Sequence, residues 1–390
     1  NGQYFLTYVG HAGPLSITRS NMWTSTLAQS TYYPHLPILT TACCEVARYD
    51  SDTRGIAEFM FHNPNGGAIA MIATPRQTLD SNNYLMNKGF VSSCFNYRNT
   101  GTMLTLGEVY MQMKAYFGTA SNGNKLSYSL LGDPAIKCNY PKPLFNITSI
   151  NGKSINNTSK VETSPMQELT VTAQVNKADG SGIDTDFNGD ATLTLYDTKR
   201  LLRTIEDYEG TRRVQRSIYY PRDILARVQG RVVNGVFNGT LYVPRHTKGL
   251  YEDASIQVYA HQDNTDNMVN GEFNGLTMGI YNDETAVTDD NAPVIEHMFI
   301  NDELSFADGC VVPQNSILHI SASDDVAINT MSASVGNTMK LLLDGGKTSL
   351  SLVKNSAVAS NEGRDLEIAF PLSTISEGNH TLTFTVFDIA

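Results

Sequence analysis

Two short segments near the start of the chain place reactive side chains directly after apolar runs. The segment YVGHAGP has His11 after one such run, and PILTTACCEVARYD has Cys43 and Cys44 after the next. A cysteine attacks as its thiolate, and a nearby imidazole lowers the thiol pKa from about 8.5 and takes up the proton. A histidine and a cysteine at successive segment ends are therefore the two side chains that acyl transfer by a thiol requires at the least. Both residue types also occur in ordinary cores.

Length and composition bound the class of protein. A chain of 390 residues is too long for one ordinary core, so we expect two to four domains. A hydrophobic content of 41% with 17% charged residues is typical of a folded, soluble protein. The net charge of −11 argues against nucleic acid as a partner, because nucleic acid rewards clustered Lys and Arg. Both ends of the sequence lie within strand-like patterns, which we interpret as a fragment cut at both ends.

Up to about residue 140, apolar strands alternate with helical segments. The expected strands are 4–10, 36–42 and 66–74, and the expected helices are 20–30, 54–63 and 104–118. The first helix is expected to begin near Ser20 or Asn21, and the last to end at Gly118. Continuous apolar strands separated by helices predict a mostly parallel sheet covered on both faces.

From roughly residue 144 the pattern changes to short segments of period two, broken by Gly, Asn and Asp. The clearest are 168–175, 190–197, 235–244, 254–261, 316–324, 365–372 and 380–388. The stretch TDDNAPVIEHMF carries turn formers and a proline, which places a boundary near residue 290. We therefore expect an α/β domain over 1–143, an Ig-like β-sandwich over 144–290, and a second, truncated Ig-like sandwich over 291–390.

In a parallel α/β sheet, reactive groups collect at the carboxyl ends of the strands. His11 and Cys44 fall at such ends on consecutive strands, so we expect their side chains to be neighbours. Two alternatives for the cysteine pair are a vicinal disulfide and a soft metal site, but no second His/Cys cluster at zinc spacing accompanies it. The remaining cysteines are scattered, and the sequence does not tell whether Cys94 and Cys138 form a bridge.

At these residues the chain resembles the gingipain family of cysteine peptidases, in the caspase-like clan. The family pattern is an apolar strand ending in His-Gly, followed by an apolar strand ending in a small residue and Cys, and YVGHAGP and LTTACCE follow it. NPNGGAIAMIATPR resembles the family's Gly-Gly strand, and LLGDPAIK the end of its catalytic domain. Within the family, the following β-sandwiches are most similar to those of the sortases of the type IX secretion system.

The resemblance implies a caspase-like α/β domain, incomplete at its N-terminus, with Cys44 as nucleophile and His11 as general base and then acid. The backbone N–H groups of Ala12 and Cys44 would form the oxyanion hole. Ala12 replaces the family's glycine and keeps the N–H donor unless the site needs a positive φ. Cys43 stands at the family's small residue. Because neighbours on a strand point in opposite directions, Cys44, at the family position, is the expected nucleophile.

Further residues near the site have two interpretations each. Trp23 could line the substrate cleft, but a core position is equally expected. Glu45, Arg48 and Asp50 could shape specificity, or could be ordinary polar residues at a helix start. No metal ion and no organic cofactor is expected.

The resemblance also implies an activity, a location and partners. The enzyme would remove the C-terminal sorting domain of type IX secreted proteins and transfer the acyl group to an amine on anionic lipopolysaccharide, or to water. It would act at the cell surface of a Gram-negative bacterium, associated with the outer membrane and with other secretion components there. The alternatives are a secreted, digestive gingipain-type peptidase and a non-catalytic surface-binding module.

One loop in the β-rich part is spaced like a calcium loop. DTDFNGDATL has Asp184, Asp186, Asn188 and Gly189 at calcium-loop positions, but Leu195 stands where a bidentate Glu is required. Hairpin turns rich in Asx and Gly look the same, so we predict a turn here.

Overall fold

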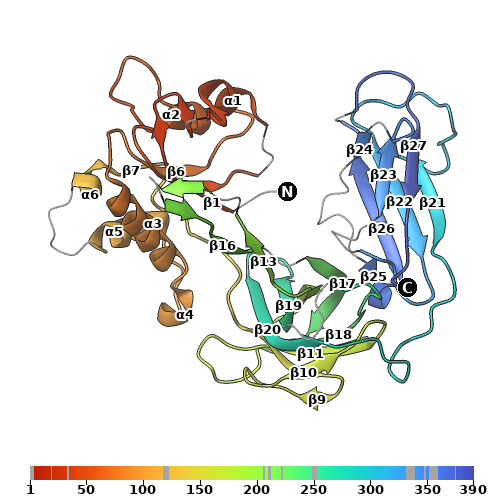
Figure 1. Ribbon diagram of the computed structural model, residues 1–390. Coiled ribbons are helices and arrows are strands. Elements are labelled where there is room, and N and C mark those ends of the chain that lie inside the picture. Colours follow the sequence, from red (N-terminus) through yellow and green to blue (C-terminus); the bar gives the residue numbers. More distant parts are fainter. Residues whose placement is uncertain are drawn as a thin grey trace. The chain divides into compact units, whose positions relative to one another are not determined.

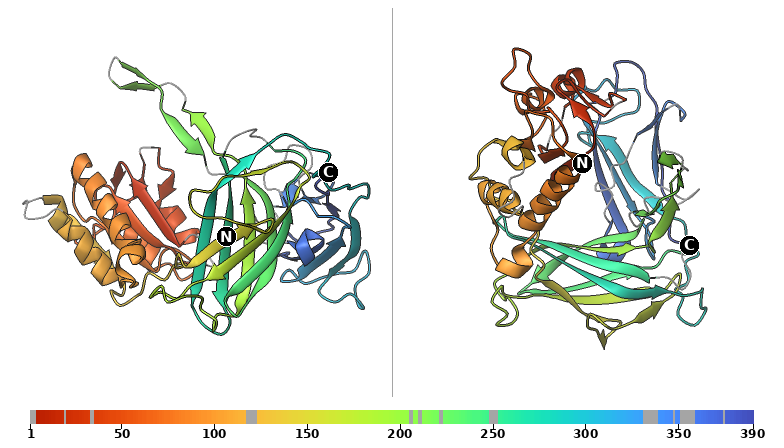
Figure 2. Two further views of the ribbon diagram at one scale, coloured as in Figure 1. Left: turned by 90° about the horizontal axis from the view of Figure 1, so that it is seen from below. Right: turned by 60° about the vertical axis from the view of Figure 1, so that its left-hand side comes forward.

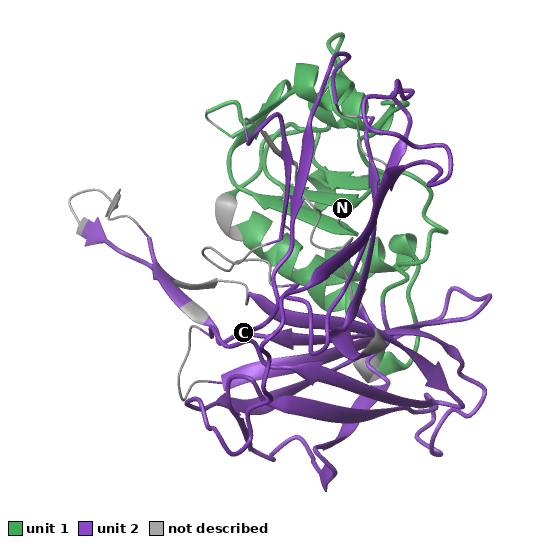
Figure 3. Ribbon diagram, turned by 90° about the vertical axis from the view of Figure 1, so that its right-hand side faces the viewer, with its two compact units in different colours: residues 1–140 green, residues 141–390 purple. Residues whose placement is uncertain are grey.

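The computed structural model describes residues 4–18, 20–32, 35–116, 123–204, 207–209, 212–220, 223–247, 253–330, 339–346, 348–350, 359–373 and 375–390. The chain divides into two compact units, residues 1–140 and residues 141–390 (Figure 3). Each unit is described by itself below.

A four-stranded sheet forms the centre of the first unit, in the order β1-β5-β6-β7. β1 (Phe5–Val9) pairs in parallel with β5 (Ile38–Ala42), and β5 pairs in parallel with β6 (Ala70–Ala73). β7 (Ser129–Leu131) runs antiparallel at the edge beside β6. The expected mostly parallel sheet is confirmed, and β7 is a strand that the sequence pattern did not indicate.

Helices cover both faces of this sheet, and alternation along the strands decides which side chains meet which helices. Leu39 and Met71 pack with residues of α1 (Ser25–Ser30) and α2 (Ile56–Phe61). The intervening Ile38, Ala70 and Ile72 pack with residues of α3 (Asp80–Cys94) and α5 (Leu106–Ala115). Figures 1 and 2 show α3 and α5 side by side. Apolar cores on both faces explain why β6 is continuously apolar and why even Thr40 and Thr41 of β5 are buried.

The first helix begins later than expected. β2 (Ala12–Gly13), β3 (Ser16–Ile17) and β4 (Trp23–Thr24) form a small antiparallel sheet, and α1 follows β4 directly. The hydroxyl of Thr24 accepts a hydrogen bond from the N–H of Leu27 and so caps the helix. The expected start at Ser20 or Asn21 is therefore wrong, because strand pairing holds the preceding residues out of the helix.

The longest helix of the first unit, α3, has an unfavourable sequence for a helix. DSNNYLMNKGFVSSC is rich in Asn, Ser and Gly, which have low helix propensity. Met86, Phe90 and Cys94 nevertheless form a buried stripe at every fourth position. Packing of this stripe against the sheet stabilises the helix, since tertiary contacts outweigh propensity. The short helices α4 (Tyr97–Thr100) and α6 (Gly123–Ser127) complete this unit.

The helix α5 begins with a reciprocal cap. The N–H of Thr105 donates to Glu108 Oε2 at 2.7 Å, and the N–H of Glu108 donates to the Thr105 hydroxyl at 3.3 Å. The described helix ends at Ala115, and the expected C-cap, Gly118, lies outside the described residues.

The first part of the second unit is one continuous, curled β-sheet in the order β10-β20-β19-β12-β17-β18-β11-β8-β9. All neighbours on this path are antiparallel except the parallel pair β10 and β20. The strands are β8 (Phe145–Ile150), β9 (Lys153–Ser154), β10 (Val161–Thr163), β11 (Glu168–Val175), β12 (Gly189–Tyr196), β17 (Ile224–Val233), β18 (Val236–Tyr242), β19 (Asp253–Gln262) and β20 (Met268–Met278). The sheet curves until β8 contacts β20, and it encloses one apolar core (Figure 2).

The period-two pattern predicted these strands because one face of the sheet is buried. Along β11, the side chains of Leu169, Val171, Ala173 and Val175 are buried and those between them are more exposed. A separate arm projects from this sheet (Figure 2). It consists of β13 (Arg200–Arg203) with β16 (Ser217–Tyr220), and β14 (Asp207–Glu209) with β15 (Arg212–Val214).

The second part of the unit has its own apolar core. One group of antiparallel strands has β22 (Ile317–Ser323) between β21 (Val294–Ile300) and β26 (Asp365–Pro371). A second antiparallel sheet has β23 (Lys340–Leu343) between β24 (Thr348–Leu350) and β27 (Leu382–Thr385). β25 (Ala359–Ser360) pairs with β26 and, in parallel, with β17 through Val228 and Ala359. Two separate Ig-like sandwiches with a boundary near residue 290 stay a prediction.

The described residues of the second unit form almost no helix. Among its described residues the one helical segment is a single 3-10 turn, η1 (Asn361–Gly363), as the sequence pattern predicted. Of the helices described in either unit, none has the length and apolar character to cross a membrane.

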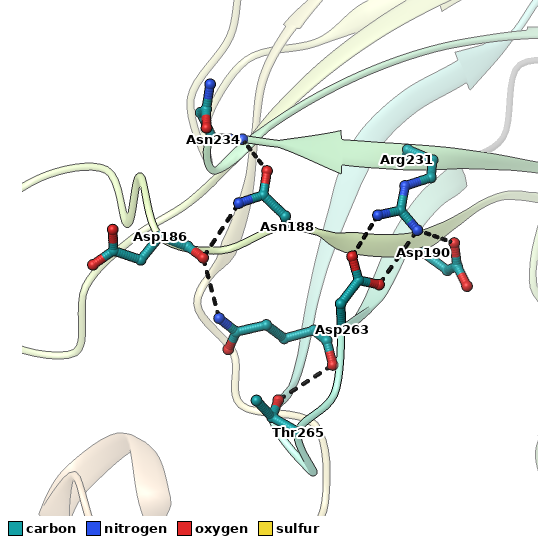
Figure 4. A network of polar contacts seen from close by, with 8 residues as sticks. Asp186, Asn188, Asp190, Arg231, Asn234, Asp263 and Thr265 are labelled. Carbon is teal, nitrogen blue, oxygen red and sulfur yellow. Dashed lines mark hydrogen bonds and ion pairs between the residues drawn. The ribbon is translucent and has the colours of Figure 1, made fainter.

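The calcium-like loop before β12 forms a turn, as expected (Figure 4). The backbone carbonyl of Asp186 accepts a hydrogen bond from the Asn188 side chain at 3.4 Å, and Asn188 Oδ1 accepts the N–H of Asn234 at 2.9 Å. Arg231 pairs with Asp190 at 2.7 Å and with Asp263 at 2.5 Å. These polar groups are therefore satisfied by one another rather than directed at a common point.

Candidate active site

The pairing of β1 with β5 places His11 and Cys44 equally far beyond the ends of two neighbouring strands. Val9 pairs with Ala42 at the end of the parallel ladder, and the N–H of Gly10 donates to the carbonyl of Ala42 at 3.3 Å. His11 lies two residues beyond Val9, and Cys44 two residues beyond Ala42. Paired strands lie about 4.8 Å apart. The thiol and the imidazole therefore leave neighbouring strands at equivalent positions on the carboxyl edge of the sheet.

The two adjacent cysteines have opposite environments. Cys43 is completely buried in the core that contains α1 and α2, and burial raises the pKa of its thiol to about 12. Cys44 is half-buried. The hydroxyl of Thr74 donates to the carbonyl of Cys43 at 2.5 Å and fixes the peptide between the two cysteines. Of these two cysteines, only Cys44 has the exposure that a nucleophile requires.

A third strand end also contributes to this site. The N–H of Thr78, five residues beyond β6, donates to Cys44 Sγ at 3.4 Å, and Cys44 Sγ lies 3.6 Å from the Thr78 carbonyl oxygen. Two backbone hydrogen bonds hold the segments after β5 and β6 side by side. The N–H of Glu45 donates to the carbonyl of Arg76 at 3.2 Å, and the N–H of Ala47 donates to the carbonyl of Thr74 at 2.9 Å. Sequence reasoning missed Thr78. The available signal was its place just after the third apolar strand.

The backbone directly after Cys44 is strained. Glu45 has φ of +55°, in the left-handed region that costs a non-glycine residue about 1 kcal/mol. Such strain concentrates at functional sites, where surrounding contacts hold it in place. The Glu45 carboxylate lies 3.7 Å from the guanidinium of Arg48. The alternative that Glu45 stands at a helix start is wrong, because the next helix begins at Ile56.

Two hydrogen bonds fix the peptide that follows His11. The hydroxyl of Tyr8 donates to the His11 carbonyl at 2.7 Å, and the N–H of Thr18 donates to the same oxygen at 3.0 Å. The His11 side chain is exposed. Ala12 lies in β2 with extended backbone, so the alanine replaces a glycine here without needing a positive φ. Trp23 packs against the same core as Cys43, which matches the core interpretation of this residue.

An exposed ion pair lies beyond the cysteine. Arg76 Nη1 donates to Asp50 Oδ1 at 2.6 Å, and this hydrogen bond holds the pKa of the Asp50 carboxyl below its usual range. Neither residue releases its proton to a substrate near neutral pH, so the pair is no candidate for a general acid. Their contact links the segment after β5 to the segment after β6.

All five cysteines are free. Cys94 and Cys138 are buried on the face of the sheet packed by α3 and α5. Their mutual hydrogen bond raises the pKa of Cys94 and lowers that of Cys138. Burial of both thiols keeps the pair away from any substrate. Cys310 is exposed in the second unit.

A thiol and an imidazole are the residue types by which nucleophilic catalysis at a cysteine works, and here both stand at the carboxyl edge of neighbouring parallel strands. Residues 1–139 match the model of peptidase family C25. This part of the chain is gingipain-like, as the resemblance at His11 and Cys44 indicated.

Solved structures show further similarity. Dimeric latent PorU from Porphyromonas gingivalis has 25% sequence identity and a TM-score of 0.40, over 76% of this chain and 27% of that chain. The Arg-specific cysteine proteinase gingipain R has 13% identity and a TM-score of 0.33, over 71% of this chain and 53% of that one. The chain therefore spans about a quarter of the PorU chain and about half of the gingipain chain. No curated protein sequence matches it.

Proposed function

We propose that the chain is part of a cysteine peptidase in which Cys44 is the nucleophile and His11 the general base and then acid. The observation that supports this most strongly is the register of β1 and β5, which ends with Val9 opposite Ala42 and brings both residues to one edge of the sheet. The family match over residues 1–139 supports the same chemistry.

In this mechanism His11 takes the proton of the Cys44 thiol, and Sγ attacks the carbonyl carbon of the scissile bond. The N–H of Thr78 stabilises the sulfur while it carries negative charge. The oxygen that becomes negative in the tetrahedral intermediate binds the N–H groups of Ala12 and Cys44. Among the described residues the N–H of Cys44 donates no hydrogen bond, so it is free for this role. His11 then returns the proton to the leaving amine, which leaves a thioester on Cys44.

The acyl acceptor decides between a peptidase and a sortase. Water releases a free acid, whereas an amine that attacks the thioester forms a new amide. We propose a PorU-type sortase, which removes the C-terminal sorting domain of type IX secreted proteins and passes the acyl group to an amine on anionic lipopolysaccharide, or to water. Support comes from the gingipain-type motifs followed by a second unit whose described elements are strands and one 3-10 turn. Trp23 and Glu45 remain candidates for contacts with the substrate.

This activity places the enzyme at the cell surface, associated with the outer membrane of a Gram-negative bacterium. Its partners would be the sorting domains of its substrates and the other type IX components of that membrane. The net charge of −11 argues against a nucleic-acid partner.

The test replaces Cys44 and, separately, Cys43 in the full-length protein that contains this chain. Cys44→Ala should abolish release of sorting domains, so that many secreted proteins accumulate with the domain attached, as immunoblots and mass spectrometry would show. Cys43→Ala is the matched control and should retain processing, because its thiol is buried away from the site.

The outcomes separate the alternatives. A digestive peptidase would lose one proteolytic activity in Cys44→Ala and leave the processing of secreted proteins normal. Processing at the wild-type rate with no proteolytic activity lost would contradict any enzymatic role and leave a surface-binding module.

A further inference from the structure

Within the described part of the chain, the sulfur of Cys44 makes its hydrogen bonds with one residue, Thr78. The N–H of Thr78 donates to Sγ at 3.4 Å, and its carbonyl oxygen lies 3.6 Å from Sγ. The Thr78 hydroxyl oxygen is a third contact, 3.7 Å from Sγ. The polar groups of Thr78 therefore converge on the atom that the proposed mechanism uses as nucleophile.

Several contacts hold Thr78 beside the sulfur. The hydroxyl of Thr74 donates to the Cys43 carbonyl at 2.5 Å, and the N–H of Glu45 donates to the Arg76 carbonyl at 3.2 Å. Two residues after Thr78 the chain enters α3, whose buried stripe packs against the sheet. Thr78 itself is half-buried, and its branched Cβ leaves the side chain few rotamers. The connection between β6 and α3 therefore presents the Thr78 hydroxyl in a defined position.

The order of the strands separates Thr78 from the proposed base. β5, which precedes Cys44, lies between β1 and β6 in the sheet. His11 follows β1, and Thr78 follows β6. The two residues thus approach Cys44 from the strands on either side of β5, so Thr78 can contact the sulfur without taking the place of the imidazole.

The contribution of each group of Thr78 depends on the charge of the sulfur. A thiol has one proton, which it can donate to the Thr78 carbonyl, whereas a thiolate only accepts hydrogen bonds. The hydroxyl can rotate, so it accepts from the thiol and donates to the thiolate. Hydrogen bonds to a charged atom are roughly twice as strong as neutral ones. The hydroxyl therefore stabilises the thiolate more than it stabilises the thiol.

We propose that Thr78 takes part in catalysis, in that its hydroxyl donates a hydrogen bond to Cys44 Sγ once His11 has taken the thiol proton. This inference rests on the proposed function, in which Cys44 is the nucleophile. The step converts the thiol and the neutral imidazole into a thiolate and an imidazolium, and the hydroxyl keeps its own proton throughout. When Sγ forms the bond to the scissile carbonyl carbon, the negative charge passes to the carbonyl oxygen and the hydroxyl is released from the sulfur.

This role has opposite effects on the amount of thiolate and on its reactivity. One hydrogen bond to a charged group raises the thiolate population about 10-fold. A more stable thiolate is also a weaker nucleophile, here by about 3-fold. The net effect of the hydroxyl is a gain of about 3-fold where the thiol is mostly protonated, and a loss of about 3-fold where it is fully ionised. A side chain that only fills space does not produce this reversal.

Alkylation by iodoacetamide over a series of pH values tests the inference, in the full-length protein with Cys310→Ser. Thr78→Val keeps the shape of the side chain and loses the hydroxyl, whereas Thr78→Ser keeps the hydroxyl. By peptide mapping, Cys44 in Thr78→Val should react about 3-fold more slowly than in the wild type at pH 7, and about 3-fold faster on the alkaline plateau of the rate. Thr78→Ser should follow the wild-type profile.

Turnover gives a second measurement. Thr78→Val should lower kcat of the full-length enzyme by about 3-fold and leave KM unchanged, because the hydroxyl acts on the sulfur rather than on substrate binding. Thr53→Val, which removes a threonine hydroxyl at an exposed position, is the control and should match the wild type.

Four results would overturn the inference. They are a wild-type alkylation profile in Thr78→Val, alkylation slowed by the same factor at every pH, faster alkylation of Thr78→Val at pH 7, and no rescue by Thr78→Ser. Cys44→Ala tests the proposed function separately. Unchanged processing in that variant removes both proposals, whereas lost processing together with any of the four results removes the role of Thr78 alone.

Discussion

The hydroxyl of Tyr8 donates a 2.7 Å hydrogen bond to the backbone carbonyl of His11, three residues further along the chain. This bond closes the turn that carries the imidazole out of β1. Tyr8 also packs against the core that buries Cys43. The position of the proposed base is therefore tied to the core beneath the proposed nucleophile.

Removing this hydroxyl should affect activity more than stability. A hydrogen bond contributes about 0.5–1.5 kcal/mol, so Tyr8→Phe should lower kcat/KM of the full-length enzyme by about 2- to 10-fold. Tm should change little, since the phenyl ring still packs against the core. Tyr49→Phe, which removes an exposed hydroxyl 3.3 Å from Ser129 Oγ, is the control. Equal kinetic effects in both variants would show that Tyr8 does not position His11.

The accessibility of the cysteines predicts which of them reacts with iodoacetamide. Cys44 is half-buried and Cys310 is exposed, whereas Cys43, Cys94 and Cys138 are buried. In a Cys310→Ser background, peptide mapping of the native protein should therefore find one alkylated cysteine, Cys44. The buried three should react only after denaturation. Modification of Cys43 before Cys44 would transfer the nucleophile role to Cys43.

The left-handed backbone at Glu45 predicts a stabilising substitution. Glu45→Gly should be more stable than Glu45→Ala by about 1 kcal/mol, because glycine adopts positive φ without steric cost. Both variants lose the contact with Arg48, so the difference between them reports the backbone alone. Denaturant unfolding measures it. Equal stabilities would mean that the strain is relieved in solution.

The hydrogen bonds of His380, in the second unit, predict that the stability of the protein depends on pH. The hydrogen bond from His380 Nδ1 to Asp344 Oδ2, at 2.9 Å, raises the pKa of His380, and Nε2 lies 2.8 Å from the Ser376 carbonyl. The folded state therefore holds the imidazole proton more tightly than the unfolded state does. The resulting stabilisation is complete below a pH of about 6.5 and is lost as the pH rises through the folded pKa.

Thermal unfolding between pH 5.5 and 8.5 measures this contribution. The Tm difference between the wild type and His380→Asn should shrink as the pH rises. Asp344→Asn should remove most of the same pH-dependent part, because it removes the partner of the charged ring. A Tm difference that is constant with pH would contradict the assignment.

The positions of His11 and Cys44 could be predicted because they depend on local patterns. Each follows a mostly apolar strand, and a parallel sheet brings such strand ends together. Strands such as β11 were equally clear, since one buried face imposes period two. The helix α3 was missed, because its Asn, Ser and Gly content opposes the helix that the buried face of Met86 and Phe90 stabilises.

Asp289, Asp324 and Asp325 of the second unit, which each have a carboxylate oxygen within 4.8 Å of the others, show a different limit of sequence reasoning. The loop at Asp184 and Asp186 has the local spacing of a calcium site, yet its polar groups satisfy one another in a turn (Figure 4). Asp289 lies in TDDNAP, which the sequence pattern marks only as a turn, and its neighbours are at 324 and 325. No local spacing connects these positions, because strand pairing brings them together.

The parallel pairing of Val228 with Ala359 has a consequence for how the protein is made. β17 leaves the ribosome well before β25, so its edge near Val228 has no partner while the intervening residues are synthesised. If the curled sheet folds as it is synthesised, that edge stays open until the second core closes it. Contacts between residues so far apart in sequence form slowly. Until they form, the open edge is a place where a chaperone or another strand can bind.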